Sequence, residues 1–266
     1  MQEQDKKKIL DVNAVQSDRR GWSGILETVM RKFRNISFFL VLIPIAFLYI
    51  FCVGVALIPG VTLYKFVGEL TAQSTPLWQN VGVAMSVSAA FFLYGLSIIF
   101  VVPAVNKLLP LKVKPHRATW YSLSVVPWYY HNALTYLVRY TFLEFITPTP
   151  LNKLFYQMMG MKIGKGTIIN TTNISDPCLI EIGDFVTIGG SCTIVAHYGM
   201  KGFLIIDRVK IEDKATIGLR AIVFGDVVVG KGALVKANDV VMPKTRIPPR
   251  EEKPQEAPPE RESQTA

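Results

Sequence analysis

Two long stretches in the N-terminal half of the chain carry no charged residue. The first lies between residues 34 and 65, and its apolar part, 36–57 ("ISFFLVLIPIAFLYIFCVGVAL"), exceeds the roughly 20 residues that a helix needs to cross a bilayer core. The second lies between residues 69 and 107, with its apolar part near 81–109. The pattern predicts two transmembrane helices within 35–110. A cleaved signal peptide does not fit the first stretch, because its apolar part is too long and begins too far from the N-terminus.

Residues 111–160 are predicted to connect these helices to the rest of the chain. Their part 118–138 is again uncharged, but Pro127 interrupts it, and it is rich in Trp and Tyr, which prefer the headgroup level of a bilayer. We expect an interfacial or re-entrant segment here, with a third membrane span as the alternative. An amphipathic stretch broken by Pro148 and Pro150 follows.

Further along, an aliphatic side chain recurs at every sixth position. Ile182, Ile188 and Ile194 share one such phase. A second phase comprises Ile205, Ile211, Ile217, Val223, Val229, Val235, Val241 and Ile247. A period of six fits neither a helix nor a free strand, so each unit is a short strand plus a turn, with three units to a coil. The spacing therefore predicts a parallel β-helix over 161–247, with the aliphatic side chains stacked inside.

The spacing is interrupted once. Between Ile194 and Ile205 the gap is eleven residues, and a lone histidine, His197, stands inside it. An inserted loop projects from a corner of a coil without disturbing the inner stack, so we expect His197 at the root of a corner loop. We also expect Ile217 one coil above Ile194, which would place Arg220, and then Asn238, above His197.

Residues 161–247 resemble the hexapeptide-repeat acyltransferases, most clearly in "IEDKATIGLRAIVFGDVVVGKGALVKANDVVMPKTRIPP". The resemblance implies a left-handed parallel β-helix, although parallel connections are otherwise right-handed. It also implies transfer of an acyl group, commonly acetyl, from coenzyme A to a hydroxyl or amine, and a homotrimer with its site between neighbouring β-helices. Residues 85–247, with "WYYHN" and "GMKIGKGTIINTTNISDPCLIEIGDFVTIGG", are similar to the membrane-attached β-helix at the end of certain non-ribosomal peptide synthetases.

The resemblance also implies roles for individual residues. His197 would be the general base, a task that suits imidazole near neutral pH, with Asp207 or Glu181 considered as the group that orients it. The expected coenzyme-binding residues are Gly218, Arg220, Ala221, Lys236, Ala237, Asn238, Lys244 and Arg246, with Lys214 and Lys231 as further candidates for its phosphates. Taken singly, a loop histidine is more often a plain surface residue, and a coil lysine or arginine more often a solvated side chain.

Some positions depart from the family pattern. Thr216 stands where an aromatic residue is common, and "PPRE" replaces a closing "GNPA". These departures favour a second hypothesis, in which the β-helix is a non-catalytic trimerisation or scaffold module of a membrane biosynthetic complex. The zinc carbonic anhydrases of this fold need three histidines that meet at an interface, and the coils hold one, so no metal is expected.

The distribution of charged residues predicts how the chain is oriented in the membrane. The net charge is +9, and Lys and Arg concentrate in residues 1–34 and just after the second apolar stretch. By the positive-inside rule both flanks face the cytoplasm, and anionic lipid accounts for the charge without nucleic acid. An amphipathic helix near "GWSGILETVMRKFRN" could lie on the membrane surface. The three cysteines form no CxxC pair, which is typical of reduced thiols, and residues 248–266 are expected to be disordered.

Together these features predict N-terminal transmembrane helices followed by an all-β left-handed parallel β-helix. We expect an integral protein of a bacterial inner membrane, with its N-terminus and β-helix in the cytoplasm. The predicted function is an acetyl-CoA-dependent or other acyl-CoA-dependent acyltransferase, a trimer in contact with membrane lipids, whose acceptor is an amphiphile or saccharide.

Overall fold

The structure is a computed structural model that describes residues 11–250. The basic residues Lys6, Lys7 and Lys8 lie outside the described range, as do residues 251–266 of the tail for which disorder was expected.

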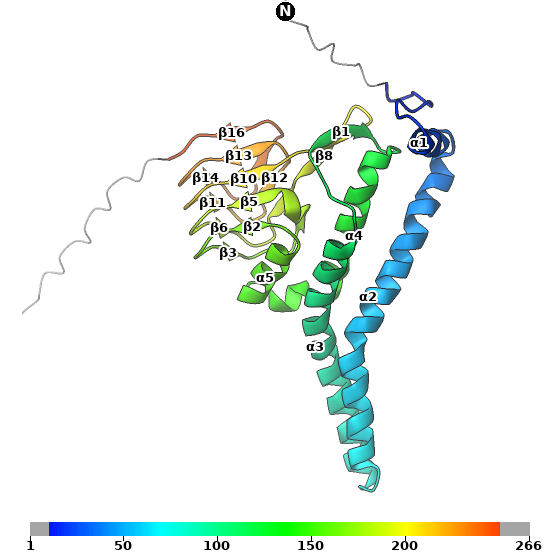
Figure 1. Cartoon of the computed structure of the whole chain (residues 1–266). Coiled ribbons are helices and arrows are strands. Elements are labelled where there is room, and N and C mark those ends of the chain that lie inside the picture. The colour runs from blue at the N-terminus through cyan, green and yellow to red at the C-terminus, as the bar shows by residue number, and fades with distance from the viewer. Residues whose placement is uncertain (1–10, 251–266) are drawn as a thin grey trace, which may run out of the picture.

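The N-terminal region contains two long antiparallel helices. α1 (Trp22–Lys32) leads into α2 (Arg34–Thr71), which turns back into α3 (Pro76–Leu108). The long helices form a hairpin that extends beyond the rest of the molecule (Figure 1). They approach closely at Gly60, where a Cβ atom would lie 2.8 Å from that of Ala90. Within residues 11–250, α2 and α3 are the two helices long and apolar enough to cross a membrane.

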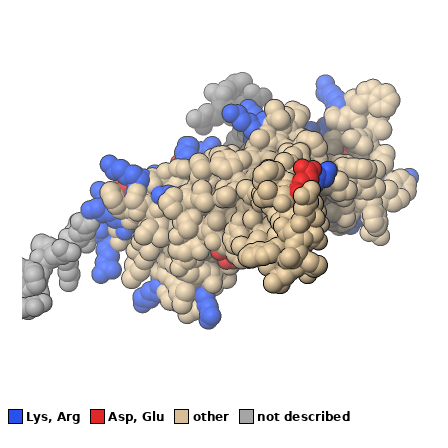
Figure 2. Space-filling model, turned by 90° about the horizontal axis from the view of Figure 1, so that it is seen from below, with Lys and Arg blue, Asp and Glu red and all other residues tan. Residues whose placement is uncertain are grey.

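The surface of the α2–α3 hairpin is as apolar as a membrane-spanning segment requires. Large apolar side chains such as Phe47, Ile50, Leu70 and Trp78 are more than half exposed. Figure 2, which views the molecule from the free end of the hairpin, shows few charges there, whereas Lys and Arg gather over the edges of the β region. Water does not stabilise an apolar surface of this extent, so lipid or protein has to cover it.

The connector folds into short elements packed on the β region. These are β1 (His116–Thr119), η1 (Leu123–Val125), α4 (Val126–Thr141), η2 (Leu143–Ile146) and α5 (Pro150–Met158). The α4 helix has 16 residues, fewer than the roughly 20 that a span requires, and six of them are buried. Since α4 bonds to α3 through His131 and Asn106 and to the β region through Asn132 and Asp176, it packs against protein on two sides, and the alternative of a third membrane span does not fit.

Short parallel strands follow, with a buried aliphatic core. They are β2 (Lys162–Ile163), β3 (Ile168–Ile169), β4 (Ile174–Ser175), β5 (Ile180–Ile182), β6 (Thr187–Ile188), β7 (Thr193–Val195), β10 (Val209–Ile211), β11 (Thr216–Ile217), β12 (Ile222–Val223), β13 (Val227–Val229), β14 (Leu234–Val235), β15 (Val240–Val241) and β16 (Arg246–Ile247), with the 3-10 turn η3 (Pro177–Leu179) after β4. The first sheet has the order β16-β13-β10-β5-β2, the second β14-β11-β6-β3 and the third β15-β12-β7-β4. The chain visits the three sheets in turn, which is consistent with a parallel β-helix.

The residues at the six-residue spacing stack inside these sheets. In the first sheet Ile182 pairs with Ile211, which pairs with Val229, and all three side chains are at most 4% exposed. The small residues at the corners, such as Ala215 and Ala221, are buried as well. Burial of one aliphatic side chain contributes roughly 1.5–3 kcal/mol, so each coil adds a comparable increment to the same core.

The eleven-residue gap is an ordered hairpin. β8 (His197–Met200) and β9 (Phe203–Ile206) are antiparallel, and β1 pairs with β9 to complete a three-stranded sheet. Ile205 pairs with Tyr198 on one side and Arg117 on the other, so its assignment to the inner stack is wrong. Ile205 matches the six-residue phase because β9 is itself a run of strand-forming residues, "FLII".

The outer faces of the three sheets differ in charge. The first sheet exposes a row of mainly charged side chains, which are Lys162, Glu181, Lys210, Val228 and Arg246. The second sheet presents Ile168, Thr187, Thr216 and Leu234, and the third presents Thr193, Ile222 and Val240. The first face is typical of a solvated surface, whereas the other two carry no charge along their strands.

Candidate active site

His197 begins β8 at the point where the chain leaves the third sheet. Its imidazole Nδ1 lies 2.5 Å from Oδ2 of Asp176. The Asp176 side chain is fully buried, whereas that of His197 is 20% exposed. An ionised carboxylate can only accept hydrogen bonds, so this contact places the imidazole proton on Nδ1. The lone pair of Nε2 is then available to take up a proton from a substrate.

Three donors hold the buried carboxylate of Asp176. Its Oδ2 accepts from the backbone N–H of Ala196 at 3.0 Å as well as from His197, and its Oδ1 accepts from Nδ2 of Asn132 at 2.6 Å. The backbone of Asp176 is left-handed, with φ 59° and ψ 44°, so the side chain leaves a tight corner just before Pro177. Hydrogen bonds of this kind offset the cost of keeping a charge out of water.

The α4 helix covers this pair from the side. Trp128 packs edge-on against the imidazole, with ring centroids 4.9 Å apart. Asn132, one turn later on the same face, bonds to Asp176. His131 faces the other way, and its Nδ1 lies 3.1 Å from Oδ1 of Asn106 on α3. The site is therefore shared between the β-helix and the helix that separates it from the apolar hairpin.

Two neighbouring titratable groups are held neutral. Burial lowers the pKa of His131 to about 4, although the Asp176 carboxylate opposes part of this shift. Burial, followed by the charge of Asp176, raises the pKa of the Cys178 thiol to about 12. Neither group is suited to proton transfer or nucleophilic attack near neutral pH.

A groove of about 430 Å³ lies beside the hairpin that His197 begins. Tyr198 and Met200 line it from β8, while Phe224, Met242 and Lys244 line it from the two coils above. Its lining is mainly apolar with one cation, Lys244, and does not include His197 itself. Such a composition suits a substrate with an apolar part and an anionic group.

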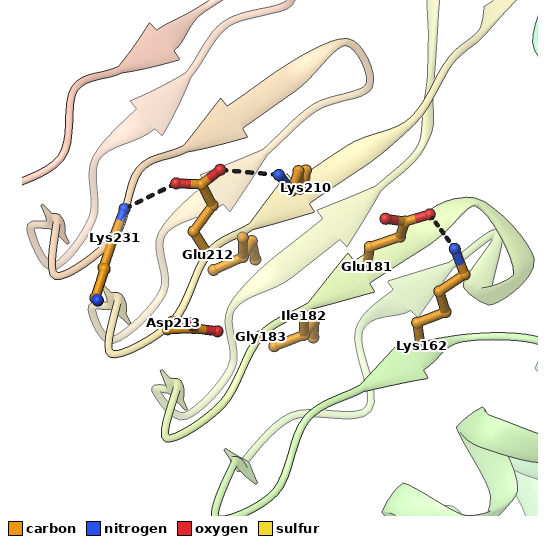
Figure 3. Close-up of a pocket in the computed structure, with 9 residues that line it drawn as sticks. Lys162, Glu181, Ile182, Gly183, Lys210, Glu212, Asp213 and Lys231 are labelled. Carbon is orange, nitrogen blue, oxygen red and sulfur yellow. Dashed lines mark hydrogen bonds and ion pairs between the residues drawn. The ribbon is translucent and has the colours of Figure 1, made fainter.

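A second hollow, of about 460 Å³, lies on the charged face of the first sheet (Figure 3). There Lys162 contacts Glu181 at 2.7 Å, and Lys210 contacts Glu212 at 2.9 Å (Figure 3). These charges largely neutralise one another. The hollow also extends to the corner after the first sheet, at Gly183, Asp213 and Lys231, whereas His197 stands at the corner before that sheet, so the hollow is not the candidate active site.

The structure separates the expected coenzyme-binding residues into two corners. Gly218, Arg220, Ala221, Lys236, Ala237 and Asn238 follow strands of the second sheet, whereas Lys244 and Arg246 lie at the corner that also carries His197. Ile194 pairs with Val223 and not with Ile217, because the β8–β9 hairpin lengthens the coil that contains it. The expected position of Arg220 above His197 is therefore wrong.

Local contacts show what lies in these positions. The N–H of Arg220 donates to the carbonyl of Gly190 at 3.0 Å, in the corner after the second sheet. Gly225 lies above the backbone of Ala196 and His197 instead, since a Cβ atom there would come within 3.1 Å of the backbone nitrogen of His197. The N–H of Gly218 donates to the carbonyl of Val235 at 2.9 Å, so this donor is used within the sheet and is not available to a ligand.

Neither acid considered as the orienting group is near the imidazole. Glu181 pairs with Lys162 in the first sheet, and Oδ1 of Asp207 accepts from the backbone N–H of Arg208. Asp176, Asn132 and Trp128 were missed, although all three lie within the segments that resemble the β-helix of certain non-ribosomal peptide synthetases. The period of six places strands but does not say which helix side chain meets which corner. Among residues 11–250 no group of three His, Cys, Asp or Glu side chains could hold a metal ion.

Comparisons with known proteins give only remote likenesses. No family model matches the chain, and no curated protein matches it. A hexapeptide-repeat-containing acetyltransferase from Vibrio cholerae aligns with 45% of this chain and 82% of its own, at 16% identity and a TM-score of 0.34. A galactoside acetyltransferase in complex with coenzyme A aligns with 45% of this chain and 73% of its own, at 16% identity and a TM-score of 0.34. A serine acetyltransferase from Neisseria gonorrhoeae aligns over 71% and 73% of the two chains, at 18% identity and a TM-score of 0.28. At such scores the likeness carries no functional argument.

Proposed function

We propose that this protein is a membrane-anchored acyltransferase that uses an acyl-CoA, most simply acetyl-CoA, and His197 as general base. The observation that carries the proposal is the contact between partly exposed His197 and fully buried Asp176. A buried carboxylate that fixes the tautomer of an accessible imidazole is a recurring arrangement for proton abstraction. The His197 side chain is 20% exposed, so part of the imidazole is accessible from outside.

The chemistry needs little more than this pair. The acceptor hydroxyl or amine gives its proton to Nε2 of His197 as its oxygen or nitrogen attacks the thioester carbonyl. The tetrahedral adduct then expels the thiolate of coenzyme A, which takes the proton from Nε2. Asp176 keeps the Nδ1 proton in place and stabilises the imidazolium that exists between the two steps.

A homotrimer would complete the coenzyme site. In one chain, Arg220, Lys236 and Asn238 stand at a different corner of the coil from His197. A neighbouring β-helix would bring that corner to the groove. The uncharged outer faces of the second and third sheets support such packing, and the coils stack roughly along the long axis of the hairpin (Figure 1). Three hairpins would thus insert in parallel into one membrane.

The acceptor is proposed to be an amphiphile or saccharide held at the bilayer surface on the cytoplasmic side. His131, bonded to Asn106, ties α4 to the last turn and a half of α3, and Trp128 touches His197 one turn before it. The reactive imidazole is thus level with the end of α3, where Lys107 interrupts the apolar run. That level suits a headgroup more than a lipid tail.

The test is coenzyme A release by the full-length protein in lipid nanodiscs, followed with a thiol reagent as acetyl-CoA and longer acyl-CoAs are supplied with extracted membrane glycolipids. We expect turnover that His197→Ala lowers by about 10³-fold or more, with the oligomer intact. Equal thiol release by the two proteins would remove the mechanism. Lack of acyl-CoA binding at millimolar concentration would favour the non-catalytic scaffold instead.

A further inference from the structure

The α4 helix makes a row of polar contacts along the first coil of the β-helix. Arg139 bonds to the side chain of Asn173, the Tyr136 hydroxyl lies 2.7 Å from Oγ of Ser175, and Asn132 bonds to Asp176. β4, which contains Ser175, is the edge strand of the third sheet. The row therefore follows an edge that no strand covers within the described residues, and its last contact reaches the carboxylate behind His197.

Asn132 and Asp176 hold one another in two directions. Nδ2 of Asn132 donates to Oδ1 of Asp176 at 2.6 Å, and Oδ1 of Asn132 accepts from the backbone N–H of Asp176 at 3.2 Å. The two residues are 4% and 0% exposed. The same Nδ2 also donates to the carbonyl of Trp128 at 3.2 Å, which fixes the amide group on the helix. This reciprocal bonding sets both the position and the rotation of the carboxylate.

We propose that Asn132 is a positioning residue for the Asp176–His197 pair, so that a side chain of α4 sets the geometry of a base carried by the β-helix. The inference rests on the proposed function. It assigns to α4, which lies between the helical hairpin and the coils in sequence, an indirect part in catalysis through the orientation of Asp176.

Asn132 is expected to matter because a misoriented Asp176 carboxylate no longer holds the imidazole of His197. If the Nδ2 donor is lost, Oδ1 of Asp176 is left buried without that partner, and the carboxylate can rotate away from Nδ1 of His197. Side chains that orient a catalytic group in this indirect way typically change activity 10- to 100-fold. Asn132 does not line the groove beside β8, so the affinity for the acyl donor is not expected to follow.

The chain offers a matched control in Asn152 on α5. It is also buried, at 1% exposure, and its Nδ2 donates to the β-helix, at 2.8 Å from the carbonyl of Ile169. It makes no contact with Asp176 or His197. Asn152→Leu and Asn132→Leu therefore both remove one buried amide that docks a helix on the first coil, but only Asn132→Leu disturbs the pair.

The first experiment measures kcat and KM for acetyl-CoA with the full-length protein in nanodiscs. We expect Asn132→Leu to lower kcat 10- to 100-fold with KM within about twofold of wild type, and Asn152→Leu to keep both values. Equal losses of kcat in the two variants, or none in Asn132→Leu while His197→Ala is inactive, would overturn the proposal.

A second measurement does not depend on turnover. Nitrogen-15 NMR of labelled protein reports which imidazole nitrogen of His197 carries the proton. Because an oriented carboxylate holds this proton on Nδ1, the share of the Nδ1–H tautomer is expected to fall in Asn132→Leu and to stay at the wild-type value in Asn152→Leu. An unchanged value in Asn132→Leu refutes the positioning role, even if no acyl acceptor is found. Failure of the acyltransferase proposal would show separately, as wild-type protein without turnover.

Discussion

The helices α4 and α5 dock on the same first coil, but they contact it in different ways. α5 packs through Phe155 and Tyr156, both fully buried, and its polar side chains end on backbone carbonyls such as that of Thr172. α4 reaches side chains instead, and its contacts end at Asp176 behind His197. A helix that bonds to backbone supports the fold, whereas a helix that holds an ionised side chain also controls where that charge points.

The β8–β9 hairpin, which begins at His197, adds a second difference between the α4 side and the α5 side of the coil. β1, which lies between α3 and α4 in sequence, pairs with β9 of that hairpin. The α4 side of the coil thus combines a connector strand, a connector helix and an inserted loop around one carboxylate. The α5 side has no such insertion, and its surface follows the regular coil. Function is therefore expected to be sensitive to changes at α4 and indifferent to equal changes at α5.

The largest effect is expected for Asp176→Asn. The amide has no charge to stabilise the imidazolium, and it can present a donor to Nδ1, which favours the wrong tautomer. We expect kcat for coenzyme A release to fall by about 10³-fold with the fold intact. Asp184→Asn is the control, since Oδ1 of Asp184 accepts only from a corner N–H of Lys165 and from no imidazole. A kcat for Asp176→Asn within threefold of wild type would contradict the assignment of the pair.

Acid is expected to loosen α4 before α5. His131 has a pKa of about 4 in the folded protein, below its ordinary 6.5, because burial disfavours the cation. The unfolded chain therefore binds the proton first, and stability that is complete above pH 6.5 is lost as the pH falls toward 4. The loss is on the order of 3 kcal/mol at pH 4.

This pH effect can be separated from that of the carboxyl groups. Thermal unfolding in detergent is compared at pH 7 and pH 4 for wild type and for His131→Gln, which keeps a polar partner for Asn106 but does not titrate. The wild type is expected to lose more stability than the variant over this interval. Identical losses would mean that His131 charges without cost. The Asp176 carboxylate acts on the same imidazole and opposes part of the shift in the pKa of His131.

The coils could be predicted from the sequence, whereas the contacts around His197 could not, and the reason is physical. Inner positions such as Ile188 and Ile217 repeat because each must fill the same volume one coil apart, so their spacing is visible in the chain. The hairpin at His197 lengthened one coil, and this moved Arg220 to another corner. Asn132 meets Asp176 across 44 residues of sequence through the docking of a helix, which no local period records.

The smallest expected effect gives the closest comparison of the two helices. Tyr136→Phe removes the α4 hydroxyl that bonds to Oγ of Ser175, and Tyr156→Phe removes the α5 hydroxyl that donates to the carbonyl of Thr172 at 3.3 Å. Each change deletes one hydrogen bond and little volume, so each should cost about 1 kcal/mol of stability by thermal or denaturant unfolding.

Only Tyr136→Phe should also affect turnover. Ser175 directly precedes Asp176, and a strand end that is less firmly held lets the carboxylate drift from Nδ1 of His197. We expect kcat to fall two- to fivefold in Tyr136→Phe, about 1 kcal/mol or less in the activation barrier, and to stay at the wild-type value in Tyr156→Phe. If Tyr156→Phe slowed turnover as much, the distinction between the two docked helices would be lost, and the site would depend on the rigidity of the whole first coil.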